Sequence, residues 1–225
     1  MTDHTTYGLV CSELSEDLSK TNLGELELDS FQKNSVKIKI KAASLNFPDL
    51  LMTQGKYQNK PNLPFALGME GAGIVEKIGS EVSSLKEGDE VMFGGWGHGA
   101  IAESIILPEG LVSLKPKSLN FSEAASFKTA YLTAYVGLIR RGELRQGETL
   151  LVHGASGGVG MAAVQMGKLY GARVIASGTS DEKLKIVKTW GADEIINTGL
   201  EGAVSFREEV KNLTDGKGAD VIYDP

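Results

Sequence analysis

The sequence predicts a two-domain chain, a mostly antiparallel β domain over residues 1–125 followed by an incomplete, doubly wound parallel sheet over residues 126–225. Three observations predict this α/β plus β class. Short β-like runs separated by turn signals fill the first half, and strand and helix patterns alternate in the second. An apolar run at 149–153 leads directly into a glycine-rich turn and then a helical pattern, which is the local order of a nucleotide-binding unit.

The β-like runs of the first half are expected at residues 7–11, 26–28, 35–43, 73–78, 90–93 and 100–106. The segment from Val36 to Lys41 alternates apolar and basic residues, which indicates a strand with one buried and one solvated face. Lys86-Glu-Gly-Asp89 is typical of a turn that leads into the next strand. Together these runs favour a partly closed β domain.

The second half begins with a capped helix start at Ser122 and a helical pattern that continues over 129–140. Strands are expected at 149–153, 173–177, 194–197 and 220–223, with helices between them. Such alternation predicts a parallel sheet that is covered on both faces. A dinucleotide-binding sheet usually has six strands, so we expect a C-terminally truncated sheet whose fourth strand is left at the edge.

Composition narrows the function classes. The net charge of −6 disfavours a nucleic-acid partner, which would require a basic face. Cys11 is the single cysteine, so the chain can form neither an internal disulfide nor a multi-cysteine zinc site. No segment approaches the length of an apolar membrane span, and the N-terminus lacks the pattern of a signal peptide. We therefore expect a cytoplasmic protein without a membrane partner.

The turn after the apolar run at 149–153 carries glycines at three spaced positions. Gly154 would permit the tight turn, Gly157 would let backbone N–H groups approach a pyrophosphate, and Gly160 would let the helix pack closely. The helix N-terminus adds oriented donors for the anion. The predicted dinucleotide contacts of this turn are Gly154, Ser156, Gly157, Gly158, Val159 and Gly160.

Two other interpretations of the turn stay open. Gly154-Ala-Ser-Gly-Gly158 also fits the G-x-S-x-G nucleophile elbow of hydrolases, which would need a histidine after the serine. The histidines are His4, His98 and His153, and all precede the serine. The remaining possibility is a glycine turn with a purely structural role.

The residues after the second strand favour NADPH. NAD is usually selected by a carboxylate at the end of that strand, and here Ser177 and Gly178 occupy the position. Lys183 lies nearby and suits a 2′-phosphate, although it could equally be a solvated charge on the next helix. Asp181 and Glu182 weaken the electrostatic argument.

Several longer motifs resemble one family. They are Ala42-Ala-Ser-Leu-Asn-Phe-Pro-Asp49, Gly55-Lys-Tyr57, Pro64-Phe-Ala-Leu-Gly-Met-Glu-Gly-Ala-Gly-Ile-Val75, Lys86-Glu-Gly-Asp89, Tyr131-Leu-Thr-Ala-Tyr135, the glycine turn and Gly191-Ala-Asp193. From about residue 35 onward the chain resembles the medium-chain dehydrogenase/reductase superfamily, and within it the zinc-free, zeta-crystallin-like quinone oxidoreductases. The resemblance implies a GroES-like β domain joined to a Rossmann domain, with the active site in the cleft between them. Family members then return to complete the first domain, and that return is missing here.

The resemblance also implies a reaction without zinc. Asn46 stands where zinc-dependent relatives carry a cysteine ligand, and Met69 stands where they carry a histidine ligand. Neither is a good zinc ligand, and Glu70 alone cannot hold a catalytic zinc ion. A conjugated carbonyl suits such a site because its extended π system takes up the charge.

The resemblance assigns roles to three further side chains. Thr133 is expected near the nicotinamide carboxamide, and Asn46 is expected to contact substrate or cofactor. Tyr57 corresponds to a tyrosine that in enoyl-thioester reductases contacts the substrate and can deliver a proton. Tyr57 could instead be a packed loop aromatic, and Asn46 a satisfied turn residue. His98 is given no catalytic role.

The predicted function is that of an NADPH-dependent, zinc-independent oxidoreductase of the NADPH:quinone oxidoreductase type, which transfers hydride to a quinone or an α,β-unsaturated carbonyl. An enoyl-thioester (enoyl-CoA or acyl-carrier-protein) reductase shares every motif above and is the alternative. A non-catalytic dinucleotide-binding protein is an alternative of another class. The family implies a homodimer of the full-length protein.

Overall fold

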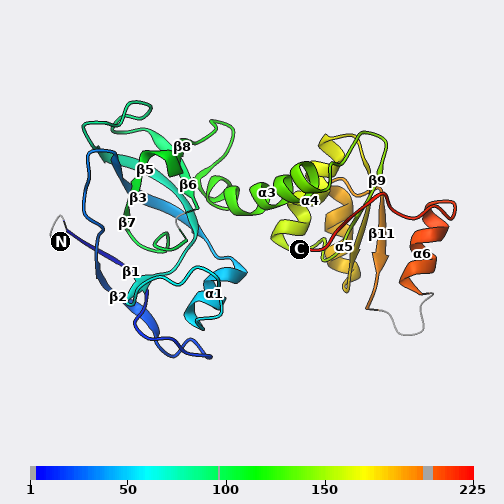
Figure 1. Cartoon of the computed structure of the whole chain (residues 1–225), viewed down its shortest axis with the longest axis horizontal. Helices are drawn as coiled ribbons and strands as arrows, with labels where there is room; N and C mark the ends of the chain where they lie inside the picture. The colour runs from blue at the N-terminus through cyan, green and yellow to red at the C-terminus, as the bar shows by residue number, and fades with distance from the viewer. Residues whose placement is uncertain (1–3, 96, 200–204) are drawn as a thin grey trace. The chain divides into compact units, whose positions relative to one another are not determined.

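The structure is a computed structural model that describes residues 4–95, 97–199 and 205–225. The chain divides into two compact units, Met1–Thr129 and Ala130–Pro225 (Figure 1). The division falls inside one helix, α3 (Lys128–Tyr135), whereas the sequence placed the boundary after residue 125. Each unit is described by itself below.

The first unit contains two antiparallel sheets. In one the strand order is β2-β1-β4, and in the other it is β7-β3-β5-β6-β8. The strands are β1 (Thr5–Cys11), β2 (Thr21–Glu27), β3 (Ser35–Ser44), β4 (Phe65–Ala66), β5 (Glu70–Ile78), β6 (Glu90–Gly94), β7 (Ser104–Pro108) and β8 (Val112–Leu114). An isolated bridge between Gly8 and Ala102 connects β1 to the segment before β7. The predicted antiparallel β domain is confirmed.

The alternating pattern of β3 is explained by its position in the middle of the larger sheet. Val36 and Ile38 are fully buried, while the lysines between and after them face outward. These apolar side chains pack with Val75, Val91 and Leu107 from neighbouring strands. Burial of such side chains stabilises the unit by roughly 1.5–3 kcal/mol each.

Some predicted strand limits in this unit are wrong. β2 begins at Thr21, because it pairs along its full length with β1, whereas the predicted strand covered only residues 26–28. β7 begins at Ser104 instead of residue 100, because the residues before it turn to bond with β1 and with Leu67. Three short helical segments complete the unit, α1 (Phe47–Thr53), η1 (Glu109–Leu111) and α2 (Phe121–Ala125).

The second unit is a four-stranded parallel sheet in the order β11-β10-β9-β12. Its strands are β9 (Thr149–Val152), β10 (Arg173–Gly178), β11 (Glu194–Asn197) and β12 (Val221–Tyr223), and its helices are α4 (Gly158–Leu169), α5 (Asp181–Thr189) and α6 (Phe206–Leu213). In chain order this is 3-2-1-4, the order expected for a dinucleotide-binding sheet. The predicted Rossmann-like sheet is confirmed, with β12 at one edge.

Helices cover both faces of this sheet (Figure 1). On one face Leu150 and Val152 pack with Ala163 of α4 and Val187 of α5. On the other face Leu151, Ile175 and Ile196 pack with Val210 of α6. Consecutive residues of β9 therefore point into opposite cores, which is why this strand is a continuous apolar run.

The helical pattern predicted over 129–140 is divided in the structure. α3 ends at Tyr135, and Val136–Arg141 (η2) continue as a wider π-helix. Gly137 lies in this segment against the ring of Tyr223, and a Cβ added there would lie 2.4 Å from a ring carbon. None of the helices in the described part of the chain has the length and apolar character needed to cross a membrane.

Candidate functional site

The glycine turn of the second unit follows β9 directly. Gly154 has φ +54°, in the left-handed region, and its carbonyl accepts a hydrogen bond of 2.9 Å from Gly157 N–H. An added Cβ at Gly160 would lie 2.4 Å from the Gly154 oxygen and 2.8 Å from Ala155 Cα. Gly160 thus lets the first turn of α4 pack on the backbone of the turn itself, and glycine is required at both positions for different reasons.

The N-terminus of α4 is suited to an anion. Gly157 is the N-cap, and its own N–H is bonded to Gly154 O. Gly158 is exposed and begins the helix, where a backbone N–H has no partner within the helix. A Cβ added to Gly158 would meet no protein atom within 4 Å, and the first turn holds no acidic residue. The dipole of this 12-residue helix adds positive potential. The donors therefore fit a pyrophosphate, with Ser156 and Val159 adjoining them.

Gly167, farther along α4, was not predicted to matter. A Cβ there would lie 2.6 Å from a methyl group of Leu150 and 3.0 Å from one of Val174. This glycine, rather than Gly160, provides the close contact of the helix with the strands. The sequence offered only an isolated glycine inside a helical pattern as a signal.

The residues at the end of β10 and just after it differ in their exposure to solvent. Ser177 is buried, and its hydroxyl donates to Val152 O and lies 3.0 Å from His153 Nδ1. Gly178 and Lys183 are more accessible, and Lys183 stands in the first turn of α5, which is capped by Ser180. The Ser177 hydroxyl is thus bonded within the protein, whereas Gly178 is partly exposed and Lys183 is exposed.

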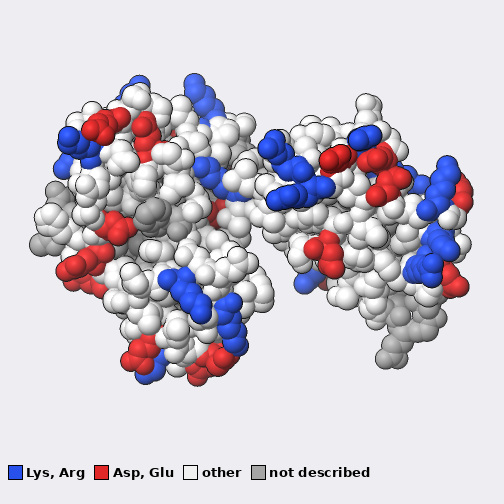
Figure 2. Space-filling view, in the orientation of Figure 1, with Lys and Arg blue, Asp and Glu red and all other residues white. Residues whose placement is uncertain are grey.

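The acidic residues near Lys183 begin one turn beyond the strand. Asp181 accepts a hydrogen bond of 2.6 Å from Asn197 Nδ2, and Glu182 is exposed. No carboxylate stands at the end of β10 itself. On the face seen in Figure 2, basic and acidic side chains are intermixed on each unit rather than gathered by sign.

His153 bears on the hydrolase interpretation of the turn. It is the only histidine of the second unit by sequence, and its ring contacts Ser177 and the ring of Phe206, 5.0 Å away. Among the residues of this unit, His153 is the imidazole that a Ser156 nucleophile could use as its base. The contacts of the ring with Ser177 and Phe206 indicate a structural role at the point where β9 ends.

α3 carries Thr133 on an exposed position of the second unit. Tyr131, two residues earlier, donates its hydroxyl hydrogen bond to Gln165 of α4, and burial raises the pKa of this phenol. The contact fixes α3 against α4 and so determines where Thr133 stands on the unit.

In the first unit, Asn46 is the N-cap of α1 and belongs to a network of polar side chains. Its amide Nδ2 donates to Ser44 Oγ at 3.1 Å and to Glu70 Oε1 at 3.1 Å. Ser44 in turn donates to the same oxygen of Glu70 at 2.9 Å. The other oxygen, Glu70 Oε2, accepts the backbone N–H of Thr129 at 2.7 Å.

A second buried carboxylate holds the backbone of Asn46. Asp49 Oδ2 accepts Asn46 N–H at 2.7 Å, and Oδ1 accepts Gly68 N–H at 2.9 Å. Burial raises the pKa of Asp49, while these two hydrogen bonds act to lower it and nearby Glu70 acts to raise it. Asp49 therefore fixes the start of α1 beside the turn that precedes Met69.

The sequence missed this network. The Asn46-x-x-Asp49 spacing resembles a capping box and could have indicated the second carboxylate. Glu70 could not be assigned in that way, because it meets Ser44 only through the pairing of β3 with β5.

Tyr57 and Met69 lie against one small core. Both pack on the cluster of Cys11, Met52, Phe65 and Leu67, and Tyr57 is only partly buried. Among the described residues, no group of three or more His, Cys, Asp or Glu side chains is arranged to hold a metal ion.

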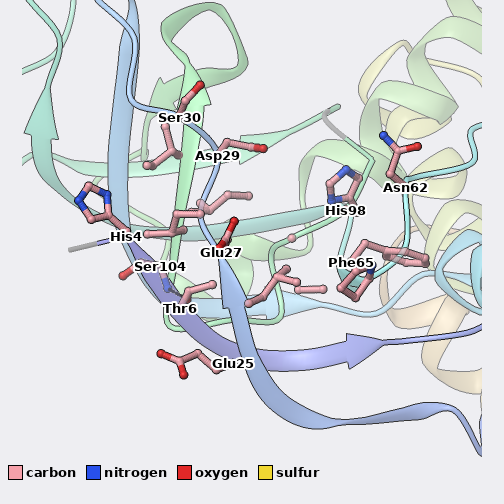
Figure 3. Close-up of a pocket in the computed structure, with 17 residues that line it drawn as sticks. His4, Thr6, Glu25, Glu27, Asp29, Ser30, Asn62, Phe65, His98 and Ser104 are labelled. Carbon is pink, nitrogen blue, oxygen red and sulfur yellow. Dashed lines mark hydrogen bonds between the residues drawn. The ribbon is translucent and has the colours of Figure 1, made fainter. Parts of the chain in front are cut away.

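The first unit also contains a hollow of about 1130 Å³ that the sequence did not indicate (Figure 3). His4 lies toward one end of it and His98 toward the other, with Glu27 between them in this view. The His98 ring meets Phe65 edge-on at 6.0 Å. Burial lowers the pKa of His98, and the charge of Asp29 opposes this effect.

The partly buried imidazole of His98 predicts a pH dependence of stability. Because the folded-state pKa of His98 is lowered, its contribution is present above the ordinary histidine pKa and is lost as pH falls through the folded value. We expect the unfolding free energy to fall more steeply in the wild type than in His98→Asn between about pH 8 and about pH 5. Urea titrations measure both, and His4→Asn, at an exposed position, is the control. Parallel pH profiles of His98→Asn and wild type would contradict the prediction.

The described geometry defines a Rossmann-like α/β unit that follows an antiparallel β unit in the sequence. Comparisons with known families match both parts. The Alcohol dehydrogenase GroES-like domain family matches residues 32–117, and the Zinc-binding dehydrogenase family matches residues 158–225.

Individual proteins are similar over nearly the whole chain. A quinone oxidoreductase-like protein 2 homolog of Nematostella vectensis is 37% identical over 217 residues, which are 96% of this chain and 58% of that protein. The solved structure of a probable oxidoreductase from Mycobacterium abscessus is 36% identical, with a TM-score of 0.89 over 98% of this chain and 69% of that one. A quinone oxidoreductase from Pseudomonas syringae is 34% identical, with a TM-score of 0.87 over 97% and 66%. The CurK enoyl reductase is 31% identical, with a TM-score of 0.85 over 98% and 67%.

The chain therefore belongs to the medium-chain dehydrogenase/reductase superfamily, among its quinone oxidoreductases. It spans a little more than half the length of the curated relatives that it matches.

Proposed function

We propose that this chain is part of an NADPH-dependent, zinc-independent oxidoreductase that passes hydride to a quinone or an α,β-unsaturated carbonyl. The observation that carries the proposal is the start of α4, where exposed Gly158 presents a backbone donor and the first turn holds no acidic residue. Membership of the quinone oxidoreductases supports the choice of reaction.

The nicotinamide cofactor would supply the hydride when bound. The backbone N–H groups of Gly158 and Val159 in the first turn of α4 would hold its pyrophosphate, with Ser156 and Gly157 beside them. The exposed Thr133 would contact the carboxamide. The contribution of the protein is to bind and orient, which can supply a large part of a rate enhancement.

NADPH is favoured by the residues after β10. Lys183 is exposed, Gly178 is partly exposed, and the first carboxylate of this region, Asp181, is bonded to Asn197. The buried Ser177 hydroxyl already contacts His153, so Ser177 would shape the edge of the cofactor site. A lysine can pair with a 2′-phosphate through a charge-assisted hydrogen bond.

We expect NADPH to bind more tightly than NADH, and Lys183→Ala to weaken NADPH binding by roughly tenfold while leaving NADH unchanged. Fluorescence titration of each dinucleotide measures this. Lys185→Ala, at an exposed position of the same helix, is the matched control. Equal affinity of the wild type for the two dinucleotides would remove the 2′-phosphate assignment.

The side chains at the positions of the zinc ligands support a reaction without that metal. Asn46 is committed to Ser44 and Glu70 through its amide, and Met69 packs on an apolar cluster. Amide and thioether groups are poor zinc ligands. A substrate whose own conjugation disperses charge fits such a site.

Tyr57 is the proposed proton donor. Its ring packs on the cluster of Met52 and Phe65, which would hold the phenol in place, and the side chain stays partly exposed. A phenol is a suitable acid for a developing enolate. The substrate oxygen would receive this proton after hydride transfer.

Steady-state assays with 1,4-benzoquinone, a simple enone and crotonyl-CoA test the function. Turnover of the first two with NADPH is expected. Preference for crotonyl-CoA would favour an enoyl-thioester reductase, for which similarity to the CurK enoyl reductase is the specific support. Tight NADPH binding without turnover of any acceptor would favour a non-catalytic dinucleotide-binding protein.

A further inference from the structure

Asp181, the first carboxylate after β10, is bonded to a residue of a neighbouring strand. Its Oδ1 accepts a hydrogen bond of 2.6 Å from Nδ2 of Asn197. Asp181 is the first residue of α5, and Asn197 is the last residue of β11, a strand against which α5 packs. The bond therefore connects the start of the helix to the end of that strand.

The side-chain amide of Asn197 is oriented by a second hydrogen bond. Its Oδ1 accepts the backbone N–H of Gly199 at 2.9 Å. The carboxylate of Asp181 can only accept, so it requires the NH₂ side of the amide. If the amide turned over, its oxygen would face the carboxylate and both hydrogen bonds would be lost. Asn197 is thus a fixed donor toward position 181.

The backbone next to Asn197 is held in turn by β10. Thr198 N–H donates to Gly178 O at 2.8 Å, and the Thr198 hydroxyl donates to the same oxygen at 3.2 Å. Gly178 is the last residue of β10 and one of the predicted nucleotide contacts. The donor that holds Asp181 is therefore fixed to the strand end where the ribose of a dinucleotide is expected.

The direction in which Asp181 is held follows from the strand order. β10 lies between β11 and β9 in the sheet, and the glycine turn follows β9. A nucleotide that reaches from that turn to the end of β10 lies on the β9 side. The Asp181 carboxylate is bonded on the opposite side, at β11. Asn197 consequently holds this negative charge away from the glycine turn.

The other two charged residues in the first turn of α5 differ in their positions on the helix. Glu182 precedes the exposed Ile186 by four residues, so these two side chains share the outer face. Lys183 precedes the buried Val187 by four residues, which places it beside the face that packs on the sheet. With Asp181 bonded to Asn197, Lys183 is the charge of this turn that remains for a ligand at the end of β10.

We propose that Asn197 is a positioning residue for cofactor selection: it holds Asp181 toward β11, so that Lys183 meets a 2′-phosphate without an opposing carboxylate. Released from Asn197, Asp181 would repel the phosphate, and its oxygens would suit the 2′-hydroxyl of NADH instead. The inference rests on the proposed function for the identity of the nucleotide, and every residue in it belongs to the second unit.

Adenosine 2′,5′-bisphosphate and adenosine 5′-monophosphate are the probes, because they differ only in the 2′-phosphate and need no nicotinamide site. Calorimetric titration of both measures the selection. We expect Asn197→Ala to weaken binding of the bisphosphate by about fivefold, the effect of one exposed carboxylate brought close to a phosphate in water. Binding of the monophosphate should stay within about twofold of wild type.

An uncharged residue at position 181 separates this role from a structural one. Asp181→Asn should bind the bisphosphate at least as tightly as wild type, because it removes the repelling charge. The double variant Asn197→Ala with Asp181→Asn should bind like Asp181→Asn, since an uncharged side chain needs no restraint. A double variant that binds as weakly as Asn197→Ala would assign Asn197 a structural role and overturn the proposal.

Glu208→Gln is the matched control, because it removes an exposed carboxylate from the first turn of another helix, α6. It should change the affinity for neither probe. Denaturant unfolding of each variant shows whether it is folded.

Ionic strength provides a second readout. The loss of bisphosphate affinity in Asn197→Ala, relative to wild type, should shrink between about 0.05 M and about 1 M sodium chloride, because salt screens exposed charges. A loss of the same size at both concentrations would contradict the electrostatic role of Asn197.

A failure of the proposed function would give a different result. Wild-type protein that binds neither probe would contradict the nucleotide site, and equal wild-type affinity for the two would contradict selection of NADPH; either result would overturn the inference as well. A wild-type preference for the bisphosphate that is unchanged in Asn197→Ala would overturn the inference alone and leave the proposed function standing.

Discussion

Gly160→Val is expected to abolish dinucleotide binding and to destabilise the second unit by about 2–4 kcal/mol. An added Cβ would lie 2.4 Å from the Gly154 oxygen, and neither that backbone nor α4 can move away without opening the turn. The new side chain would separate the helix N-terminus from the turn that aims its donors. Denaturant unfolding and NADPH titration measure the two effects.

Two other glycines provide the controls. Gly158→Ala adds a methyl group where no protein atom lies within 4 Å, so it should leave stability nearly unchanged yet weaken NADPH binding, because only a ligand would occupy that space. Gly110→Ala, also in open space but in the first unit, should change neither. If Gly160→Val bound NADPH as the wild type does, the glycine turn would not be the cofactor site.

Tyr57→Phe is expected to lower kcat with a quinone or enone by about 100-fold, because a general acid contributes roughly 10²–10⁴ in rate. The ring packs on the small core that includes Met52 and Phe65, and phenylalanine retains that packing. Stability and NADPH affinity should therefore be nearly unchanged. Stopped-flow measurement of NADPH oxidation under single-turnover conditions separates the chemical step from binding.

Tyr7→Phe is the matched control, since Tyr7 lies on β1 of the same unit and is 46% exposed. It should have wild-type kcat. A Tyr57→Phe variant with unchanged single-turnover rate would return Tyr57 to the role of a packed aromatic.

The burial patterns of individual strands were predicted from the sequence, because they depend on residues that are close together in it. The alternation from Val36 to Lys41 predicted a half-buried strand, and β3 has that burial pattern. The apolar run before Gly154 predicted a strand buried on both faces, and β9 points side chains into two cores. Strand order followed as well, because parallel βαβ connections leave few alternatives.

The limits of β2 and β7 could not be predicted from sequence. β2 is polar and glycine-containing, and it is a strand because its whole length pairs with β1. The segment before β7 has an apolar pattern but is drawn toward β1 by backbone bonds such as Leu9 N–H to Ile101 O. In both cases hydrogen bonds between residues distant in sequence decided the outcome.

Some parts of the candidate site could likewise be predicted from the sequence, and others could not. The glycine turn was recognisable because its residues are consecutive and each has a backbone reason to be glycine, as Gly154 with φ +54° shows. Asn46 could also be selected from the sequence as a candidate site residue. Its hydrogen-bond partners could not be predicted, since one of them, Glu70, is 24 positions away.

Residue type and short spacing were enough to predict the two-part fold, the glycine turn and the poor zinc-binding side chains at positions 46 and 69. Three features required the folded chain: the contact of Ser177 with His153, the contact of Gly167 rather than Gly160 with the strands, and the bonding of the Asn46 amide to Ser44 and Glu70. Each of these depends on strand pairing or helix packing. The fold determines which hydrogen-bonding groups and side chains come into contact.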